Sequence, residues 1–340
     1  MKEKKVSAIV VNWNGIKFLP DCLSSLFNQT YKELEVIVVD CVSKDESVPF
    51  IKTNYPRTKV IELKQDFGPP YAINLAAREA QGEYILILNN DVILPKDLIE
   101  KMVQELDKDK NSVINPVELS FKYQYLSSGC PSGWIGKFLY KIIKIKGESP
   151  FFPSTACCLT TRELVLSNPL NENLFMYEDT EWGWRLQLRK TKLKVLKGDY
   201  FLHRGSGSEN TSYSPKQAYF VGRATFATCF ICFKIPTLIL MLPILACNYL
   251  WQVSVYLKRK KFKSAFAYTK GYLFFFGKLK VFLQDRKMTQ LRREVKDGKI
   301  LKQMIGSIDF AKRAKSEWKG KEGSLNLSKE MVYSPLEVTR

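Results

Sequence analysis

The chain has 340 residues, 45% of them apolar and 26% charged, a globular composition that excludes the disordered and fibrous classes. Its formal net charge of +19 is uneven, because residues 256–340 carry +14 and residues 1–255 carry +5. An excess confined to one end argues against a uniformly basic nucleic-acid-binding protein, so we predict no nucleic-acid partner. Basic segments of this kind attract phosphates and anionic lipid surfaces.

Four strand-like runs alternate with helical patterns over about the first 110 residues. The runs are Val6–Val11, Glu35–Val39, Val60–Leu63 and Tyr84–Leu88. Near-continuous apolar strands between helices are typical of a parallel sheet covered on both faces, so the predicted fold class is α/β. Residues 111–222 are less regular, although Glu178–Lys190 has a helical pattern.

A third segment begins near residue 223 and contains Ile235–Leu257, which is 23 residues long and carries no charge. About 20 apolar residues span a bilayer core, but two prolines and two amides interrupt this stretch. A spanning helix, helices lying in the membrane interface and a soluble core all remain open. Lys258–Lys261 follow at once and predict a position on the cytoplasmic face of the cell membrane.

The eight cysteines include one pair with metal-like spacing, Cys229 and Cys232. This pair lies in an apolar run and has no partner pair, so we interpret both residues as core thiols. The cysteine usage indicates a reducing compartment.

Polar residues follow two of the predicted strands, and ligands of open α/β sheets bind at such carboxyl ends. Asp40 could accept a hydrogen bond from a nucleotide base or ribose, or it could cap the following turn. Asn89, Asn90 and Asp91 follow the fourth strand, where a carboxylate suits Mg²⁺ or Mn²⁺ bound to substrate phosphates. A strand-end turn is the competing interpretation of these three residues.

An acidic cluster, Glu178-Asp179-Thr180-Glu181, precedes Trp182 and Trp184. A carboxylate here could serve as a general base and the tryptophans could stack on a sugar, while an acidic helix N-terminus is the alternative. His203, the single histidine, precedes a Gly/Ser-rich stretch and could bind a metal or a pyrophosphate. The chain has no P-loop motif and no G-x-G-x-x-G after the first strand, which excludes P-loop enzymes and argues against Rossmann dehydrogenases.

Five motifs occur in a fixed order: V-V-N-W-N-G, V-I-V-V-D-x-x-S-x-D, Q-G-E-Y-I-L-I-L-N-N-D, F-M-Y-E-D-T-E-W-G-W-R-L and H-R-G-S-G-S. Together, from about residue 6 to about 225, they resemble family 2 glycosyltransferases, in particular a rhamnosyltransferase-like, membrane-associated branch. The resemblance implies a GT-A fold over 1–222, with a donor-binding half to about residue 110 and an acceptor half over 111–222. Membrane-associated helices over 223–285 and a basic tail over 286–340 would follow.

The resemblance also implies roles for individual residues. Asp91 and His203 would hold a divalent metal, Mg²⁺ or Mn²⁺, on the donor diphosphate. Asp179 would be the catalytic base, with Glu181 orienting it or the acceptor. The donor-binding residues would be Asn12, Asn14, Asp40, Asp66, Asn89, Asn90 and Asp91, and the acceptor-binding residues Trp182 and Trp184.

The sequence departs from the family pattern at three places, one of which is Cys41-Val42, where Asn-Gly or Asn-Ala is more usual. Asn89 replaces the first aspartate of the D-x-D motif, and Pro69-Pro70 stand where the family has a glycine pair in a donor loop. The predicted reaction is inverting transfer from a nucleotide-diphosphate sugar to a hydroxyl acceptor, a lipid-linked or cell-surface glycan precursor. A sugar nucleotidyltransferase and an inactive, membrane-tethered binding protein with a transferase-like domain are the alternatives.

Overall fold

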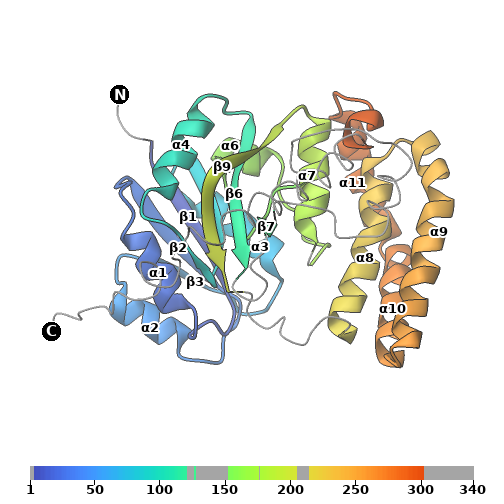
Figure 1. The fold of residues 1–340 in the computed structure, drawn as a ribbon, viewed down its shortest axis with the longest axis horizontal. Helices are drawn as coiled ribbons and strands as arrows, with labels where there is room; N and C mark the ends of the chain where they lie inside the picture. The colour runs from blue at the N-terminus through green and yellow to red at the C-terminus, as the bar shows by residue number, and fades with distance from the viewer. Residues whose placement is uncertain (1–3, 121–125, 128–151, 176, 205–213, 302–340) are drawn as a thin grey trace, which may run out of the picture.

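The computed structural model describes residues 4–120, 126–127, 152–175, 177–204 and 214–301. In these residues a mixed sheet with helices on both faces stands beside a group of long helices, and α7 lies between the two (Figure 1).

The first half of the sheet is parallel and has the strand order β3-β2-β1-β4. The bounds are Val6–Asn12 for β1, Leu34–Asp40 for β2, Lys59–Glu62 for β3 and Tyr84–Asn89 for β4. Each strand agrees with a predicted run to within one residue at either end. The predicted α/β class is therefore confirmed, and the carboxyl ends of these strands lie along one edge.

The second half of the sheet is mixed. Its strands are β8 (Cys157–Thr161), β6 (Ser112–Ser120), β9 (Lys192–His203), β5 (Val92–Ile93) and β7 (Leu126–Ser127). Here β8 runs antiparallel to β4, β6 antiparallel to β8, and β9 parallel to β6. The short β5 pairs antiparallel with β9. This pairing places the end of β9 next to the residues that follow β4.

Helices bury both faces of the sheet because successive strand residues point to opposite sides. Ala8 and Val10 face one cluster of buried side chains, whereas Ile9 faces the other. The first face is covered by α1 (Leu19–Phe27), α2 (Ser47–Asn54) and α4 (Leu98–Asp107). The second face is covered by α3 (Pro69–Glu79), α6 (Arg162–Ser167) and α7 (Glu178–Leu188).

The C-terminal helices are α8 (Pro215–Cys232), α9 (Ile235–Lys258), α10 (Phe262–Gly277) and α11 (Leu279–Leu291). Two glycines allow α8 and α10 to approach closely. A Cβ on Gly222 would lie 2.4 Å from the Tyr268 carbonyl oxygen, and one on Gly271 would lie 2.1 Å from that of Tyr219. Trp184 of α7 packs on Phe233 with 5.1 Å between ring centroids, which ties these helices to the sheet domain.

The domain boundaries predicted at 222/223 and 285/286 both fall inside helices. Residue 222 lies within α8, which begins at Pro215 after Ser214 caps it by accepting a hydrogen bond from the Gln217 N–H. Residue 286 lies within α11, where the Arg286 and Gln290 side chains donate to carbonyl oxygens at the end of α8. Ile300 is fully buried, so the helical part extends at least to residue 301. Residues 302–340, most of the predicted tail, lie outside the described part.

The apolar stretch Ile235–Leu257 forms a single helix, α9, with Pro243 inside it. It is the one helix in the described part of the chain that is long and apolar enough to cross a membrane, and 22% of its most apolar window is buried. Length and composition do not distinguish a span from an interfacial helix. Cys229 and Cys232 are buried free thiols of α8, as predicted.

Candidate active site

The carboxyl ends of β1, β2 and β4 meet in a hydrogen-bonded cluster. The strand register places Asn12 beside Asp40 and Val11 beside Asn89. The Asn12 amide donates to an Asp40 carboxylate oxygen at 2.8 Å, and the Asn90 amide donates to the Asn12 oxygen at 2.8 Å. The predicted donor residues of three strands therefore form one cluster.

The turns after β1 and β2 hold each other in place. Ser43 Oγ accepts from the Asn14 N–H at 2.8 Å, and Asn14 Oδ1 accepts from the Lys44 N–H at 2.8 Å. Asp40 accepts from the Ser43 N–H at 2.9 Å, which is the turn-capping contact that sequence reasoning gave as its alternative role. A carboxylate has about four acceptor positions, so this contact leaves Asp40 able to accept from a nucleotide as well.

Asp66 lies at the outer edge of this cluster. Its side chain is exposed and accepts from the Gly68 N–H at 2.9 Å, just before α3 begins with Pro69. Burial, together with the charges of Asp66 and Asp40, raises the pKa of Cys41 to about 12. The Leu63 N–H donates to the Asp40 carbonyl oxygen at 2.9 Å, so the turn that contains Asp66 follows directly from the end of β2.

The most distinctive feature of the site is a chain of three side chains. His203 Nε2 lies 3.1 Å from Asp91 Oδ1, and His203 Nδ1 lies 2.7 Å from Glu118 Oε1. The β5–β9 pairing, which sets Val92 opposite His203, produces the first contact. Of the three, Glu118 was missed by sequence reasoning. Its one signal was a charged residue among the apolar residues of a strand.

His203 lies between two carboxylates, and this position determines the pKa of its imidazole. Burial acts to lower the pKa of the imidazole, but the hydrogen bonds and charges of Asp91 and Glu118 outweigh it and raise the pKa from 6.5 to about 10. In the absence of a cation the imidazole is therefore protonated on both nitrogens at neutral pH.

The predicted base, Asp179, comes from α7. It stands in the first turn of the helix, where its carboxylate accepts from the Thr180 N–H at 2.6 Å. Burial raises the pKa of Asp179 to about 6, and the charge of Glu118 adds to the effect. The neighbouring Glu178 is buried, which raises its pKa. Asp179 is half-buried, and a carboxylate with a pKa near neutrality that keeps some access to solvent suits a general base.

Three of the predicted site residues belong to the core instead. Glu181 is fully buried and its carboxylate lies 2.6 Å from Arg185 Nε, so it does not orient Asp179. Trp182 is 0% exposed and donates to the Asn168 carbonyl, and Trp184 is 3% exposed against Phe233. Their predicted stacking on an acceptor sugar is therefore wrong, because α7 turns both rings away from solvent.

Asp91 and His203 fit a divalent cation. Two adjacent ligands at about 2.1 Å from one ion lie about 3 Å apart, which agrees with the 3.1 Å between Asp91 Oδ1 and His203 Nε2. Glu118 binds the other ring nitrogen and would orient the imidazole. Among the described residues there is no cluster of three ligands for one ion, so a donor diphosphate would have to complete the coordination.

Comparison with known proteins identifies the family of the N-terminal domain. Residues 7–165 match the family model "Glycosyl transferase family 2". Glycosyltransferase GlyG of Streptococcus pneumoniae is 26% identical over 211 residues, which cover 58% of this chain and 70% of that protein. A poly(ribitol-phosphate) beta-N-acetylglucosaminyltransferase, TarS of Staphylococcus aureus, is 30% identical over 115 residues, 32% of this chain and 20% of TarS.

Two solved structures share the fold at low sequence identity. TarS 1–349 in complex with UDP-GlcNAc has a TM-score of 0.57 at 17% identity and covers 93% of this chain and 92% of its own. The mannosyltransferase PcManGT from Pyrobaculum calidifontis in complex with GDP-Man and Mn²⁺ has a TM-score of 0.53 at 17% identity, covering 90% and 88%. The predicted GT-A fold is thus confirmed.

The family match, together with a relative named as a glycosyltransferase, identifies a glycosyltransferase. Residues 7–165, just under half of the chain, form its family 2 domain.

Proposed function

We propose that this protein is an inverting glycosyltransferase that moves a sugar from a nucleotide-diphosphate donor to a hydroxyl acceptor. The observation that carries the proposal is the chain of contacts Asp91–His203–Glu118, and the raised pKa of Asp179 supports it. These contacts bring a cation-binding pair to the carboxyl ends of parallel strands, where such folds bind nucleotides.

Each group has a distinct task in this proposal. Asp40 accepts a hydrogen bond from the nucleoside, and Asn12 and Asn90 keep its carboxylate oriented. Asp91 and His203 hold Mg²⁺ or Mn²⁺, which when bound neutralises charge on the leaving diphosphate. Asp179 removes the proton of the acceptor hydroxyl as its oxygen attacks the anomeric carbon. A single displacement of this kind inverts the anomeric configuration.

The acceptor in this proposal is a lipid-linked or cell-surface glycan precursor at the cytoplasmic face of the cell membrane. Support comes from the C-terminal helices, since residues 223–284 contain ten Lys or Arg and no Asp or Glu. Exposed apolar side chains on α9 and α10 accompany these cations. Apolar surface combined with positive charge is the combination that binds anionic membranes. An anionic lipid surface is thus a proposed partner.

The donor remains to be identified by assay. Full-length protein with Mn²⁺ is incubated with a panel of UDP-, GDP- and dTDP-sugars. The UDP-sugars come first because TarS 1–349, which shares the fold, was solved in complex with UDP-GlcNAc. Release of the nucleoside diphosphate from one donor, lost in Asp91→Ala, is the expected result. The control is Glu83→Gln, at the opposite end of β4.

The same assay separates the alternatives. A sugar nucleotidyltransferase would form a nucleotide sugar and pyrophosphate from a sugar phosphate and a nucleoside triphosphate. An inactive binding protein would bind a donor without releasing its diphosphate. The family match favours glycosyl transfer over both.

A further inference from the structure

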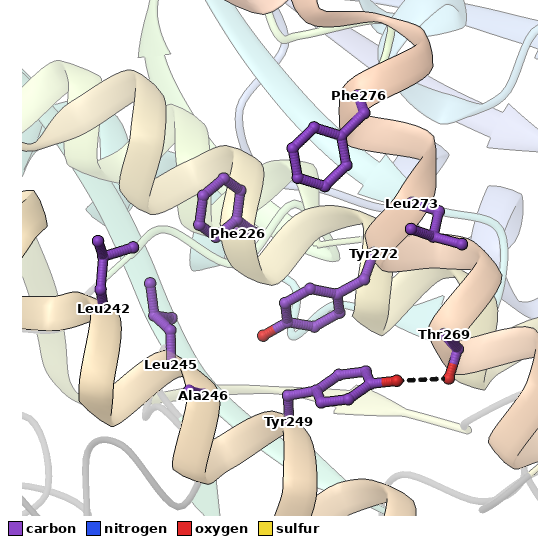
Figure 2. Close-up of a pocket in the computed structure, with 9 residues that line it drawn as sticks. All are labelled: Phe226, Leu242, Leu245, Ala246, Tyr249, Thr269, Tyr272, Leu273 and Phe276. Carbon is purple, nitrogen blue, oxygen red and sulfur yellow. Dashed lines mark hydrogen bonds between the residues drawn. The ribbon is translucent and has the colours of Figure 1, made fainter.

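A cavity of about 320 Å³ lies between α8, α9 and α10, far along the chain from the residues of the sugar-transfer site. Figure 2 shows side chains from all three helices around it, including Phe226 of α8, Leu245 of α9 and Tyr272 of α10. The hydroxyl groups of Tyr249 and Thr269 in its wall lie 2.8 Å apart and bond to each other. The cavity is therefore suited to an apolar occupant.

The size of the cavity limits what it can hold. Binding sites for small molecules occupy about 300–1,000 Å³, so this cavity lies at the small end of that range. It has room for part of one hydrocarbon chain. A polar headgroup would find few groups here with which to exchange its hydrogen bonds to water.

The cavity opens onto an exposed apolar surface. Three of its lining side chains, Leu242, Leu273 and Phe276, are 44%, 59% and 65% exposed. The surface continues along α10 with Phe266, which is 74% exposed and lies on the same helix face as Leu273 and Phe276. Contiguous apolar surface of this kind marks a site of interaction.

The charge around this surface identifies the kind of partner. Lys258–Lys261 lie between α9 and α10, and Lys278 and Lys280 follow the other end of α10. Positive charge thus flanks the apolar surface at both ends of the helix pair, with no acidic residue from 223 to 284. A partner that is complementary to this surface has an apolar interior and negative charge at its own surface. An anionic lipid bilayer has both properties.

The packing of α9 favours a position in the plane of the membrane. Its buried residues Leu238, Met241 and Leu245 form one stripe along the other helices of the protein. Its neighbour α10 carries Lys263 and Lys270, both exposed. If α9 spanned the bilayer, these two lysines would enter the hydrocarbon region, where a charge is costly.

We propose that α9 and α10 lie in the membrane interface and that the cavity between α8, α9 and α10 binds one acyl chain of an anionic phospholipid. Leu273 and Phe276 at its mouth insert among neighbouring chains, and the flanking lysines contact the headgroups. This lipid site does not include any residue of the sugar-transfer site. A measurement of lipid binding therefore tests it without an activity assay.

The test is a calorimetric titration of the full chain with dioctanoylphosphatidylglycerol below its micelle concentration. Saturable binding of one lipid per protein is expected, with no binding of glycerophosphoglycerol, the headgroup alone, and weaker binding of the zwitterionic phosphatidylcholine analogue. Ala246→Trp fills the cavity and should weaken binding about tenfold or more. Cys247→Trp adds the same ring at the next, exposed position of α9 and should bind as the parent does.

A second pair of variants avoids any risk of misfolding, because both positions are exposed. Leu273→Lys at the cavity mouth should abolish binding, whereas Leu240→Lys, which does not line the cavity, should retain it. Equal binding by Ala246→Trp and Cys247→Trp, or no binding by the parent, would overturn the proposal. So would tighter binding of geranyl phosphate, which would assign the cavity to an isoprenoid chain. A lipid-free dimer that Leu273→Lys dissociates would assign the surface to a second copy.

Discussion

His203 Nε2 lies 3.1 Å from Asp91 Oδ1, although the two residues are separated by more than a hundred positions in the chain. The contact depends on the two-residue strand β5, whose antiparallel pairing with β9 sets Val92 opposite His203. A brief strand after the N-N-D motif thus brings the histidine to the carboxylate. Four predictions follow from the site and from the helices that flank it.

Asp179→Asn should reduce sugar transfer by about 10²–10⁴-fold, because an amide cannot take the proton of the acceptor hydroxyl. Donor affinity should stay close to that of the parent, since Asp179 is assigned no contact with the nucleotide. Rates and donor affinity are measured on the same preparation, by product release and by calorimetry. Turnover of Asp179→Asn near the parent rate would remove Asp179 as the base.

The transfer rate should depend on pH through Asp179. Burial raises its pKa to about 6, so the protonated, inactive form persists to higher pH and the rate should fall as pH drops through about 6. Thr180→Val removes a hydroxyl that donates to the Asp179 carboxylate at 3.2 Å. Because that bond favours the ionised form, its loss should move the midpoint of the profile upward. A profile flat between about pH 5 and 8 would contradict this assignment.

Glu118→Gln should weaken Mn²⁺ binding in the presence of donor by about 10–100-fold, because the glutamate fixes the orientation of the His203 ring through a 2.7 Å hydrogen bond. His203→Ala should weaken it at least as much. Glu83→Gln, an exposed carboxylate at the other end of β4, is the control and should bind as the parent does. If calorimetry gave Glu118→Gln the Mn²⁺ affinity of the parent, the positioning role of Glu118 would be lost.

Gly271→Ala should lower the free energy of unfolding by about 1–3 kcal/mol, since the added Cβ would lie 2.1 Å from the Tyr219 carbonyl oxygen on α8. Gly277→Ala at the end of α10 meets nothing within 4 Å and should be neutral or slightly stabilising. Denaturant unfolding of the two variants gives the comparison. Equal stabilities would mean that α8 and α10 do not cross as closely as described.

The parallel half of the fold could be predicted from the sequence because β1, β2 and β4 are near-continuous apolar runs that are largely buried on both faces. The same reasoning located Asp40 and Asp91, since strand ends can be read from the residues that interrupt such runs. Glu118 could not be found in this way. Its partnership with His203, 85 positions away, depends on the pairing of β6 with β9, which no local pattern specifies.

The role of Trp182 and Trp184 was misjudged for a related reason. Aromatic side chains beside an acidic motif can stack on a ligand or fill a core, and the sequence around them is the same in both cases. Tertiary packing decides here: the sheet domain buries Trp182, and Phe233 at the end of α8 packs against Trp184. The predicted domain boundaries near 222 and 286 fall inside α8 and α11, because contacts between these two helices continue past the local changes in composition.

The most direct test of the account is the anomeric configuration of the first product, followed by proton NMR while the full chain turns over the donor selected by the panel. One displacement assisted by Asp179 predicts that the sugar has the configuration opposite to that in the donor, and that Asp179→Asn gives no measurable product. A product that retains the donor configuration, or one that forms at the parent rate without the Asp179 carboxylate, would contradict the account.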